Sequence, residues 1–511
     1  MRKSETSLHL LIHRLTKSEK RYFKVTCAQH QKEEDSSYFH LFDLIEKQKK
    51  YDEHQIRQSI KGKIFATNFS QAKADLFQLI LKSLRQYHHD KYHSIYLNDQ
   101  FSDFEILFTR GLFSEADNVL KKARKSKIVS DSAIEEFKTN TYSFRNAVRS
   151  NKTNLLKQLD THYFNEQSKL LKIMQDEIVI QDCFIKIYTI LRNIGILHSN
   201  NSKLDLDALV QPLLQFKLTP HTRVEIRYWY WMSYVFYHYV RSEGSKSIKA
   251  VEKVLDMYEK YDRKDMVVLD NISVITSNLL HMEVEAGHTD KATTLYYRLM
   301  DLWEKYPVIR SETKSYRVLS SLIGLYVHQG NFKQATQLHE QNVDNINLNT
   351  ADQQALISLL LKIIWLYILN KQPENARKYI RYLVDQVYTH SASDFLLASR
   401  IAAMAIMIDE NNLSVLQPFA KASERIISKF KKMDPSMTSV LNFFKGYRKS
   451  LNSKNERQLF QELKHSLMNL PDRKNLLIYK FPYLQVWIES KISNKSITNL
   501  LSANVISKSW N

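Results

Sequence analysis

The sequence predicts an all-α protein, an array of antiparallel helical hairpins preceded by a small N-terminal helical module. Glycine and proline each occur only 8 times in 511 residues, where average usage gives roughly 35 and 25. Apolar residues recur at helical spacing along most of the chain, and a hairpin-turn pattern repeats every 41 to 43 residues near its centre. The glycines lie too far apart for a Rossmann or Walker phosphate loop, so no nucleotide cofactor is expected.

Residues 1–97 are expected to form the N-terminal module. Its first helix is predicted to begin at a capping box, Thr16 to Glu19, in which each side chain satisfies a backbone N–H group at the helix terminus. Further helices are predicted over Tyr38–Lys47, Asp52–Ile60 and Ser70–His88. Such a module would cap the array or dock on another protein.

The helix over Ser70–His88 leaves open a second interpretation, a DNA-reading helix-turn-helix. Its Lys73, Lys82 and Arg85 would suit contacts with phosphate groups. The preceding helix, however, ends near Lys61-Gly62, about eight residues earlier, and a helix-turn-helix has only three or four residues in its turn. The spacing therefore favours the capping or docking role.

Residues 98–220 are expected to form a first helical-repeat segment. The hairpin-turn pattern first appears here, with Gly111 five residues before Ala116. Polar residues and two prolines in Asn200–Pro220 predict a bend at the end of the segment. The helices expected in between begin at a capping box, Ser132–Glu135, and continue over Tyr142–Leu159 and Leu170–Leu197.

Residues 221–394 are expected to form the main repeat segment. After a capping box at Thr222–Glu225 it opens with the most aromatic helix of the chain, Ile226–Val240. A helix that is apolar around most of its circumference is normally packed between other helices, but Tyr and Trp rings also line grooves that hold peptides or bases. Both interpretations stay open for Tyr228, Tyr230, Trp231, Tyr234 and Tyr237.

The clearest repeats follow. In the copy that starts at Leu322, Tyr326 is followed by Gly330 and then by Ala335. The glycine suits the left-handed backbone that ends a helix, and the alanine allows two helices to cross closely. Successive alanines are 43 and 41 residues apart. The neighbouring copies carry Gly287 with Ala292, and Tyr367 with Ala376, where Lys371 stands in place of the glycine.

The order Leu322, Tyr326, Gly330, Ala335 resembles the tetratricopeptide repeat, and the chain is identified as a divergent, elongated relative of bacterial type. The resemblance implies a right-handed superhelix of hairpins, an α-solenoid, whose surface binds other proteins. The period exceeds the 34 residues of that family, so each helix would be about one turn longer. Ser320 and Gly324 stand where some members clamp a terminal carboxylate, so that mode of binding is not expected.

Residues 395–511 are expected to form a basic helical segment that caps the array. From Lys421 to Asn511 there are 17 Lys and Arg against 6 Asp and Glu, which is more than half of the chain's net charge of +20. The predicted helices cover residues 395–408 and 414–430, and a further helix runs from a capping box at Ser453–Glu456 to Leu470.

The basic charge fits an anionic partner, whether nucleic acid, lipid or an acidic protein, and equally a solvated surface with no dedicated ligand. The longest apolar stretch, Ala355–Leu369, is about fifteen residues, and a membrane span needs about twenty. Two distant cysteines, Cys27 and Cys183, fit a reducing compartment. We therefore expect a cytoplasmic protein without membrane insertion.

No residue pattern marks a catalytic, cofactor or metal site, so an enzyme is not expected. His89 and His93 are four residues apart and are the best candidates for metal ligands, but no third ligand is marked. Solvent-facing histidines at a helix end are the alternative. Cys27 and Cys183 lie in helical segments and are expected to be inert.

Two functions remain. The first is a non-enzymatic scaffold or adaptor that binds a protein or peptide on the surface of the repeats. The alternative is a nucleic-acid-associated regulator that uses the N-terminal module or the basic C-terminal end. Binding to nucleic acid that weakens steeply with salt would distinguish the second from the first.

Overall fold

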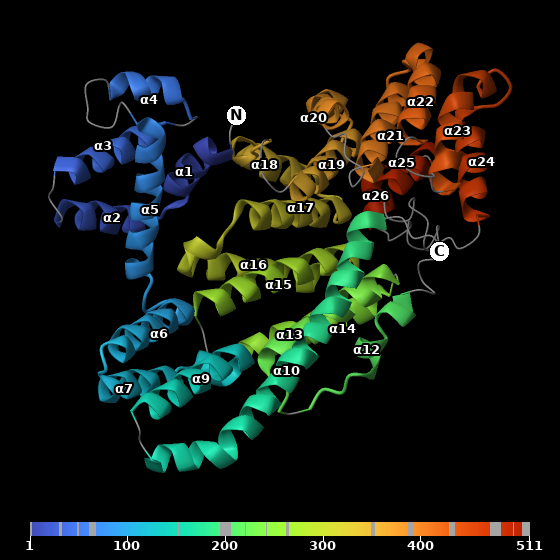
Figure 1. Ribbon diagram of the computed structural model, residues 1–511. Coiled ribbons are helices and arrows are strands. Elements are labelled where there is room, and N and C mark those ends of the chain that lie inside the picture. The colour runs from blue at the N-terminus through green and yellow to red at the C-terminus, as the bar shows by residue number, and fades with distance from the viewer. Residues whose placement is uncertain are drawn as a thin grey trace. The chain divides into compact units, whose positions relative to one another are not determined.

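The computed structural model describes residues 3–29, 33–48, 51–60, 68–150, 153–194, 206–219, 221–241, 243–261, 265–348, 353–386, 393–428, 435–470, 482–493 and 495–502. All regular structure in these ranges is helical, and they contain no strand (Figure 1). The all-α prediction is confirmed. No helix in the described part of the chain combines the length and apolar content needed to cross a membrane.

The chain divides into two compact units. The first comprises residues 1–174, 262–270 and 303–309, and the second comprises residues 175–261, 271–302 and 310–511. The four segments predicted from the sequence, 1–97, 98–220, 221–394 and 395–511, stay predictions.

The first unit has an N-terminal core built by α1 to α5, in which Ile12, Phe42 and Leu76 are fully buried. The capping box at the start of α2 forms as predicted: the Thr16 N–H donates to Glu19 Oε2 at 2.7 Å and the Glu19 N–H donates to Thr16 Oγ1 at 3.2 Å. Its helices are α1 (Lys3–Arg14), α2 (Lys17–Gln29), α3 (Glu33–Lys47), α4 (Glu53–Ser59), α5 (Phe69–Tyr87), α6 (His93–Thr109), α7 (Phe113–Arg124), α8 (Lys127–Asp131), α9 (Ala133–Arg149) and the beginning of α10 (Thr153–Ile194).

Two expectations for this region were wrong. The helix expected to be first is the second, because α1 precedes it. The segments expected over Tyr142–Leu159 and Leu170–Leu197 are divided differently: α9 ends at Arg149, and α10 is one helix of 42 residues. The sequence between 159 and 170 contains neither glycine nor proline, so nothing there stops the helix.

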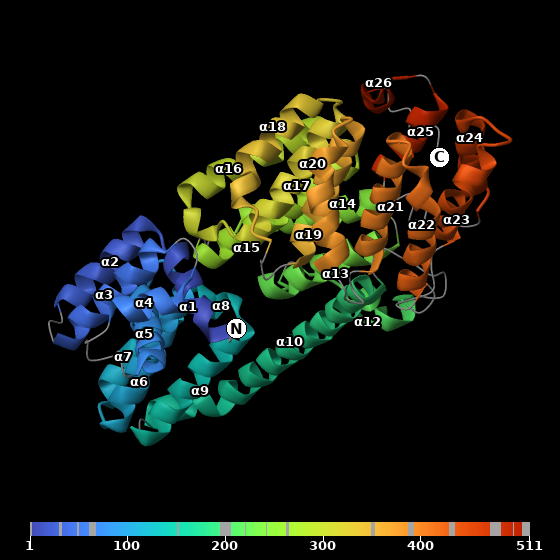
Figure 2. The ribbon, with the colours of Figure 1, turned by 90° about the horizontal axis from the view of Figure 1, so that it is seen from above.

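The second unit holds the later helices, and from α17 to α26 neighbours in the chain pack on one another, as in helical-repeat proteins. Figure 2 shows α21 to α24 standing side by side. The helices are the end of α10, α12 (Gln211–Gln215), α13 (Val224–Val240), α14 (Gly244–Glu259), most of α15 (Met266–Glu285) and of α16 (Thr289–Lys305), α17 (Glu312–His328), α18 (Phe332–Asn342), α19 (Gln353–Leu369), α20 (Pro373–Gln386), α21 (Ser393–Asp409), α22 (Leu413–Ser428), α23 (Pro435–Ser450), α24 (Glu456–Met468), α25 (Pro482–Ile492) and α26 (Ile497–Ser502), with a short 3₁₀ turn at Val343–Asn345. The start of α15, the end of α16 and a 3₁₀ turn at Pro307–Ile309 belong to the first unit.

One turn geometry recurs at the ends of five helices. In each, a residue in the left-handed region follows the helix, and the next N–H donates to the carbonyl oxygen five residues earlier, which is a Schellman turn. At Gly330 the φ angle is 71°, and the Asn331 N–H donates to the Tyr326 carbonyl at 2.8 Å. The other four turn residues are Gly111 (φ 75°), Gly287 (78°), Lys371 (56°) and Asn411 (54°).

The turn at Asn411 extends the repeat beyond residue 395, where the sequence pattern fades. Asn411 follows Lys371 by 40 residues, and the Asn412 N–H donates to the Met407 carbonyl at 2.8 Å. Five residues after each of the other four turn residues stands a fully buried alanine, and at this turn the position is occupied by the fully buried Leu416. The helical pair α21–α22 therefore uses the same turn with different side chains.

The largest core runs through α17 to α25, and the whole apolar stretch of α19 is buried in it. One polar side chain, His339, is buried beside this core. The two ring nitrogens of His339 each lie 2.7 Å from a tyrosine hydroxyl, Tyr367 on one side and Tyr379 on the other. Burial lowers the pKa of His339 to about 4, so the ring is neutral and one nitrogen donates while the other accepts.

Candidate functional site

The repeat-pattern residues lie at the helix ends and are mostly buried. Leu322, Ala335 and Ala376 are buried, as are Ala116 and Ala292. Tyr326 is partly buried against the same core. Gly111, Gly287 and Gly330 adopt the left-handed conformation of the turns. These residues pack helices together.

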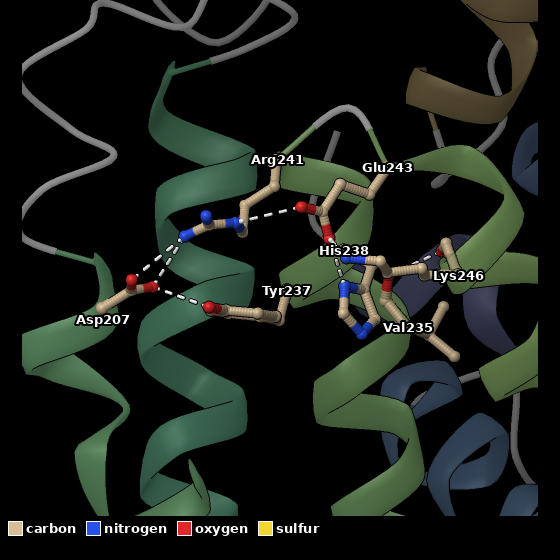
Figure 3. A network of polar contacts seen from close by, with 8 residues as sticks. Asp207, Val235, Tyr237, His238, Arg241, Glu243 and Lys246 are labelled. Atoms are coloured by element: carbon tan, nitrogen blue, oxygen red, sulfur yellow. Dashed lines mark hydrogen bonds and ion pairs between the residues drawn. The ribbon is translucent and has the colours of Figure 1, made fainter.

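The predicted groove aromatics of α13 contact residues of their own chain. Tyr237 is buried, and its hydroxyl donates to Asp207 at 2.7 Å (Figure 3). Tyr228 lies edge-on to Trp229 and Tyr258. The other three, Tyr230, Trp231 and Tyr234, contact one another.

The polar network of Figure 3 closes the turn between α13 and α14. The Asp207 carboxylate accepts from Arg241 at 2.8 Å, and the Glu243 carboxylate lies 2.8 Å from His238 Nδ1. Lys246 pairs with Glu243 at 3.2 Å, and the Ser247 hydroxyl donates to the Val235 carbonyl. Each charge in this network is matched by a charge of the opposite sign, which indicates a structural role.

A second polar cluster, in the second unit, is the candidate site. Its centre is an ion pair between Glu285, at the end of α15, and Lys362, in the middle of α19, with Nζ 2.8 Å from Oε1. The first helices of successive hairpins here are α15, α17 and α19. The middle one, α17, contributes Gly324 and His328. Four residues complete it: Tyr239 of α13, His281 of α15, Arg317 of α17 and Tyr483 of α25.

Gly324 gives the ion pair its room. A Cβ atom at this position would lie 3.2 Å from Lys362 Nζ and 3.3 Å from the Tyr483 hydroxyl, which is closer than most Cβ contacts. Glycine in a helix interior costs about 1 kcal/mol relative to alanine, so a packing reason of this kind is needed to explain it. The small residue thus allows the lysine of α19 to approach the carboxylate of α15.

The cluster fixes the protonation of its members. Desolvation opposes ionisation of Glu285, but Lys362 outweighs it with help from the two histidines, and the pKa of Glu285 falls to about 2. Desolvation and the Lys362 charge lower the pKa of His281 to about 4. Desolvation also lowers the pKa of His328. At neutral pH the site therefore contains an ionised carboxylate and neutral imidazoles.

Two members of the cluster are accessible to solvent. The Glu285 side chain is 41% exposed, against 12% for Lys362, and Tyr239 is 45% exposed. Desolvation is nevertheless the largest influence on the pKa of Glu285 and of Tyr239, and it raises that of Tyr239. Both side chains are therefore accessible to a partner.

Sequence reasoning missed this cluster, although the repeat gave a signal. Glu285, His328 and Asp409 each stand two residues before a turn residue, at Gly287, Gly330 and Asn411. A titratable side chain at the same position of three repeats is thus a pattern that the sequence already contains. Lys362 lies within the apolar stretch Ala355–Leu369, where a single charge does not indicate its partner.

The other candidates from the sequence do not converge. His89 lies in the turn after α5, 2.8 Å from Asp90 and 3.5 Å from Asp99, whereas His93 begins α6. The described residues hold no group of three or more His, Cys, Asp or Glu side chains arranged for a metal. Cys183 is buried, and desolvation raises the pKa of its thiol. The side chain of Cys27 lies outside the described residues.

Of the three cations on α5 that were expected to suit phosphate contacts, one is not accessible. Lys73 is buried and pairs with Glu53 at 2.7 Å, so its assignment as a phosphate contact was wrong. Lys82 and Arg85 are exposed. The helix before α5 is α4, which ends at Ser59. Lys61 and Gly62, where this helix was expected to end, lie outside the described residues.

No protein-family model matches the sequence, and no similar protein is found among the curated proteins. The residues of the site are therefore the basis for any statement about function.

Proposed function

We propose that the chain is a non-enzymatic scaffold or adaptor that binds a protein or peptide. The binding surface is the one built by the first helices of its hairpins, α13, α15, α17 and α19. The observation that supports this most is the cluster around the Glu285–Lys362 ion pair, to which α13, α15, α17 and α19 contribute and in which Glu285 and Tyr239 are exposed. The recurrence of one turn at intervals of 40 to 43 residues supports an elongated, tetratricopeptide-like superhelix as the framework.

The protonation of the cluster favours recognition over catalysis. An efficient general acid or base has a pKa near the working pH. Here the pKa of Glu285 is about 2 and that of His281 about 4, and desolvation raises the pKa of Tyr483 above its ordinary value. Groups with fixed charge at neutral pH are suited to holding a partner in one orientation.

Affinity purification of the full chain from its native cell, with and without nuclease, tests the proposal. The bait is compared with a Tyr239→Ala, Glu285→Gln variant and with a Tyr297→Ala control, since Tyr297 is 67% exposed on α16. We expect a protein recovered in near-equal amount that survives nuclease, is lost with the site variant and is kept with the control. Recovery that depends on nucleic acid would favour a nucleic-acid-associated regulator instead.

A further inference from the structure

The long helix α10 carries a stripe of exposed apolar side chains along one face. Successive members of the stripe are seven residues apart, and each is more than half exposed: Phe164 (67%), Leu171 (53%), Ile178 (64%) and Ile185 (61%). All four belong to one unbroken helix of 42 residues (Figure 2), so the spacing keeps them within about 60° of one another around its axis. Single exposed apolar residues are ordinary, whereas a regular row of this kind marks an interaction surface.

The opposite face of α10 is apolar as well, and it is covered. Ile180 and Ile187 are fully buried. Each stands two residues after a member of the exposed stripe, which places it about 200° away around the helix. A helix that is apolar on opposite faces is normally packed between other helices. The exposed stripe is therefore the face on which α10 would receive a further helix.

The spacing of the stripe also indicates what kind of helix fits it. Seven residues is the period at which two helices pack side by side in a left-handed coiled coil. In α10 one core position of each heptad is apolar, and the position four residues later is polar, at Ser168, Gln175 and Asp182. The apolar residues expose on the order of 400 Å², about half of what each partner buries in a standard interface. The pairing should therefore be weak and reversible.

We propose that this stripe binds the same stripe of a second copy of the chain, with the two α10 helices antiparallel. An interface with two-fold symmetry brings one patch of both copies together, so the patch must be complementary to itself. Equal spacing gives the stripe this property. With the two-fold axis beside Gln175, Leu171 of one copy lies opposite Ile178 of the other and Phe164 lies opposite Ile185, so apolar side chains meet at every level.

The charges near the stripe are compatible with this arrangement. Lys186 Nζ lies 2.6 Å from Asp182 Oδ2, and Lys169 Nζ lies 2.7 Å from Glu166 Oε1, so these charges are neutralised within α10 itself. In a parallel pair Asp182 would face the Asp182 of the other copy, and like charges at that distance repel. In the antiparallel pair Asp182 lies at the level of Ser168 instead. The antiparallel orientation is therefore favoured.

Sedimentation equilibrium of the full chain up to about 100 μM tests the proposal. We expect a reversible monomer–dimer equilibrium with a dissociation constant on the order of 10 μM. Leu171→Gln combined with Ile178→Gln should weaken the dimer at least about a hundredfold, because four apolar side chains are lost from its centre. Glutamine is a good helix former, and an unchanged circular dichroism spectrum would show that the helix is intact. The matched control is Ile106→Gln with Ile134→Gln, at positions 51% and 62% exposed on α6 and α9, and it should leave the dimer unchanged.

Disulfide formation between copies tests the orientation. Gln175→Cys should form an intermolecular disulfide under mild oxidation, because the two copies of this residue lie beside the two-fold axis. Ser168→Cys should not, because in the antiparallel pair its two copies are about 20 Å apart along the helix axis, too far for a disulfide. The wild-type chain, in which Cys183 is buried, gives the background from the native cysteines.

Three results would overturn the proposal. A chain that stays monomeric up to about 100 μM leaves the stripe to a helix of another protein. A dimer that the Leu171→Gln, Ile178→Gln variant weakens no more than the control variant does is held by another surface. A disulfide that forms as readily through Ser168→Cys as through Gln175→Cys shows that the two helices are parallel.

Discussion

Replacement of Gly330 by alanine should lower the free energy of unfolding in two ways, through the backbone conformation and through a packing clash. The backbone φ of 71° is disfavoured for any residue with a Cβ atom, which we set at about 1 kcal/mol. The new Cβ would also lie 2.8 Å from Thr498 Cγ2 of α26, and overpacking of this kind costs about 1 kcal/mol or somewhat more. Gly330→Ala should therefore destabilise the second unit by about 2 kcal/mol.

Gly287 is the matched control. Its φ is 78°, but a Cβ atom there would have no atom within 4 Å. Gly287→Ala should cost only the backbone term, about 1 kcal/mol. Adding Thr498→Ser to Gly330→Ala removes Cγ2 and should return the loss to the Gly287→Ala value.

Urea denaturation of the full chain measures these differences, and hydrogen exchange in residues 497–502 shows whether α26 is the part that loosens. Equal losses for Gly330→Ala and Gly287→Ala, with no recovery from Thr498→Ser, would refute the packing of Thr498 on the turn.

Three further predictions concern stability. Lys371→Gly should stabilise the fold by about 1 kcal/mol in urea denaturation, because Lys371 holds a φ of 56° that glycine adopts freely; destabilisation would contradict this. The His339 pKa of about 4 lies below its ordinary 6.5, so the unfolded chain takes up its proton first as pH falls. The stability advantage of wild type over His339→Gln should therefore shrink by about 2 kcal/mol between pH 7 and pH 5, and a constant difference would show that the ring is not buried neutral. Asn455→Ala should cost about 1 kcal/mol through loss of a helix cap, while Ser453→Ala should cost almost nothing; the reverse order in thermal unfolding would place the cap at Ser453.

The repeat was predictable where the turn residue is glycine. Lys371 and Asn411 adopt the same left-handed conformation without it, since the helix-ending hydrogen bonds constrain the backbone and not the side chain. The prediction at Lys371 rested on the tyrosine and alanine around it. At Asn411 those residues are Met407 and Leu416, so no residue pattern there indicates that the turn recurs.

The capping boxes show how reliably a local sequence motif predicts the start of a helix. The box at Thr16 forms, but Ser132 makes no capping hydrogen bond, and at the aromatic helix the N-cap is Arg223. In the last case the box is made by Asn455 and Gln458, two residues after the predicted one. Asparagine is among the strongest N-cap residues. The helix therefore begins after Asn455 and not after the nearby Ser453.

The candidate site could not be predicted from the sequence for a different reason. Glu285 and Lys362 are 77 residues apart, and each looks like an ordinary charge in its own helix. Their pairing depends on the space left by Gly324, a glycine without a turn role. Only the stacking of successive first helices brings them together.

Photo-crosslinking in the native cell tests the central claim most directly. A benzophenone amino acid placed at position 239 lies on α13, where Tyr239 is 45% exposed, and one placed at position 297 lies on α16, where Tyr297 is 67% exposed. If the first helices form the partner-binding surface, illumination yields a nuclease-resistant protein adduct at position 239 and none at position 297. Adducts at both positions alike, or at position 297 alone, would contradict that assignment.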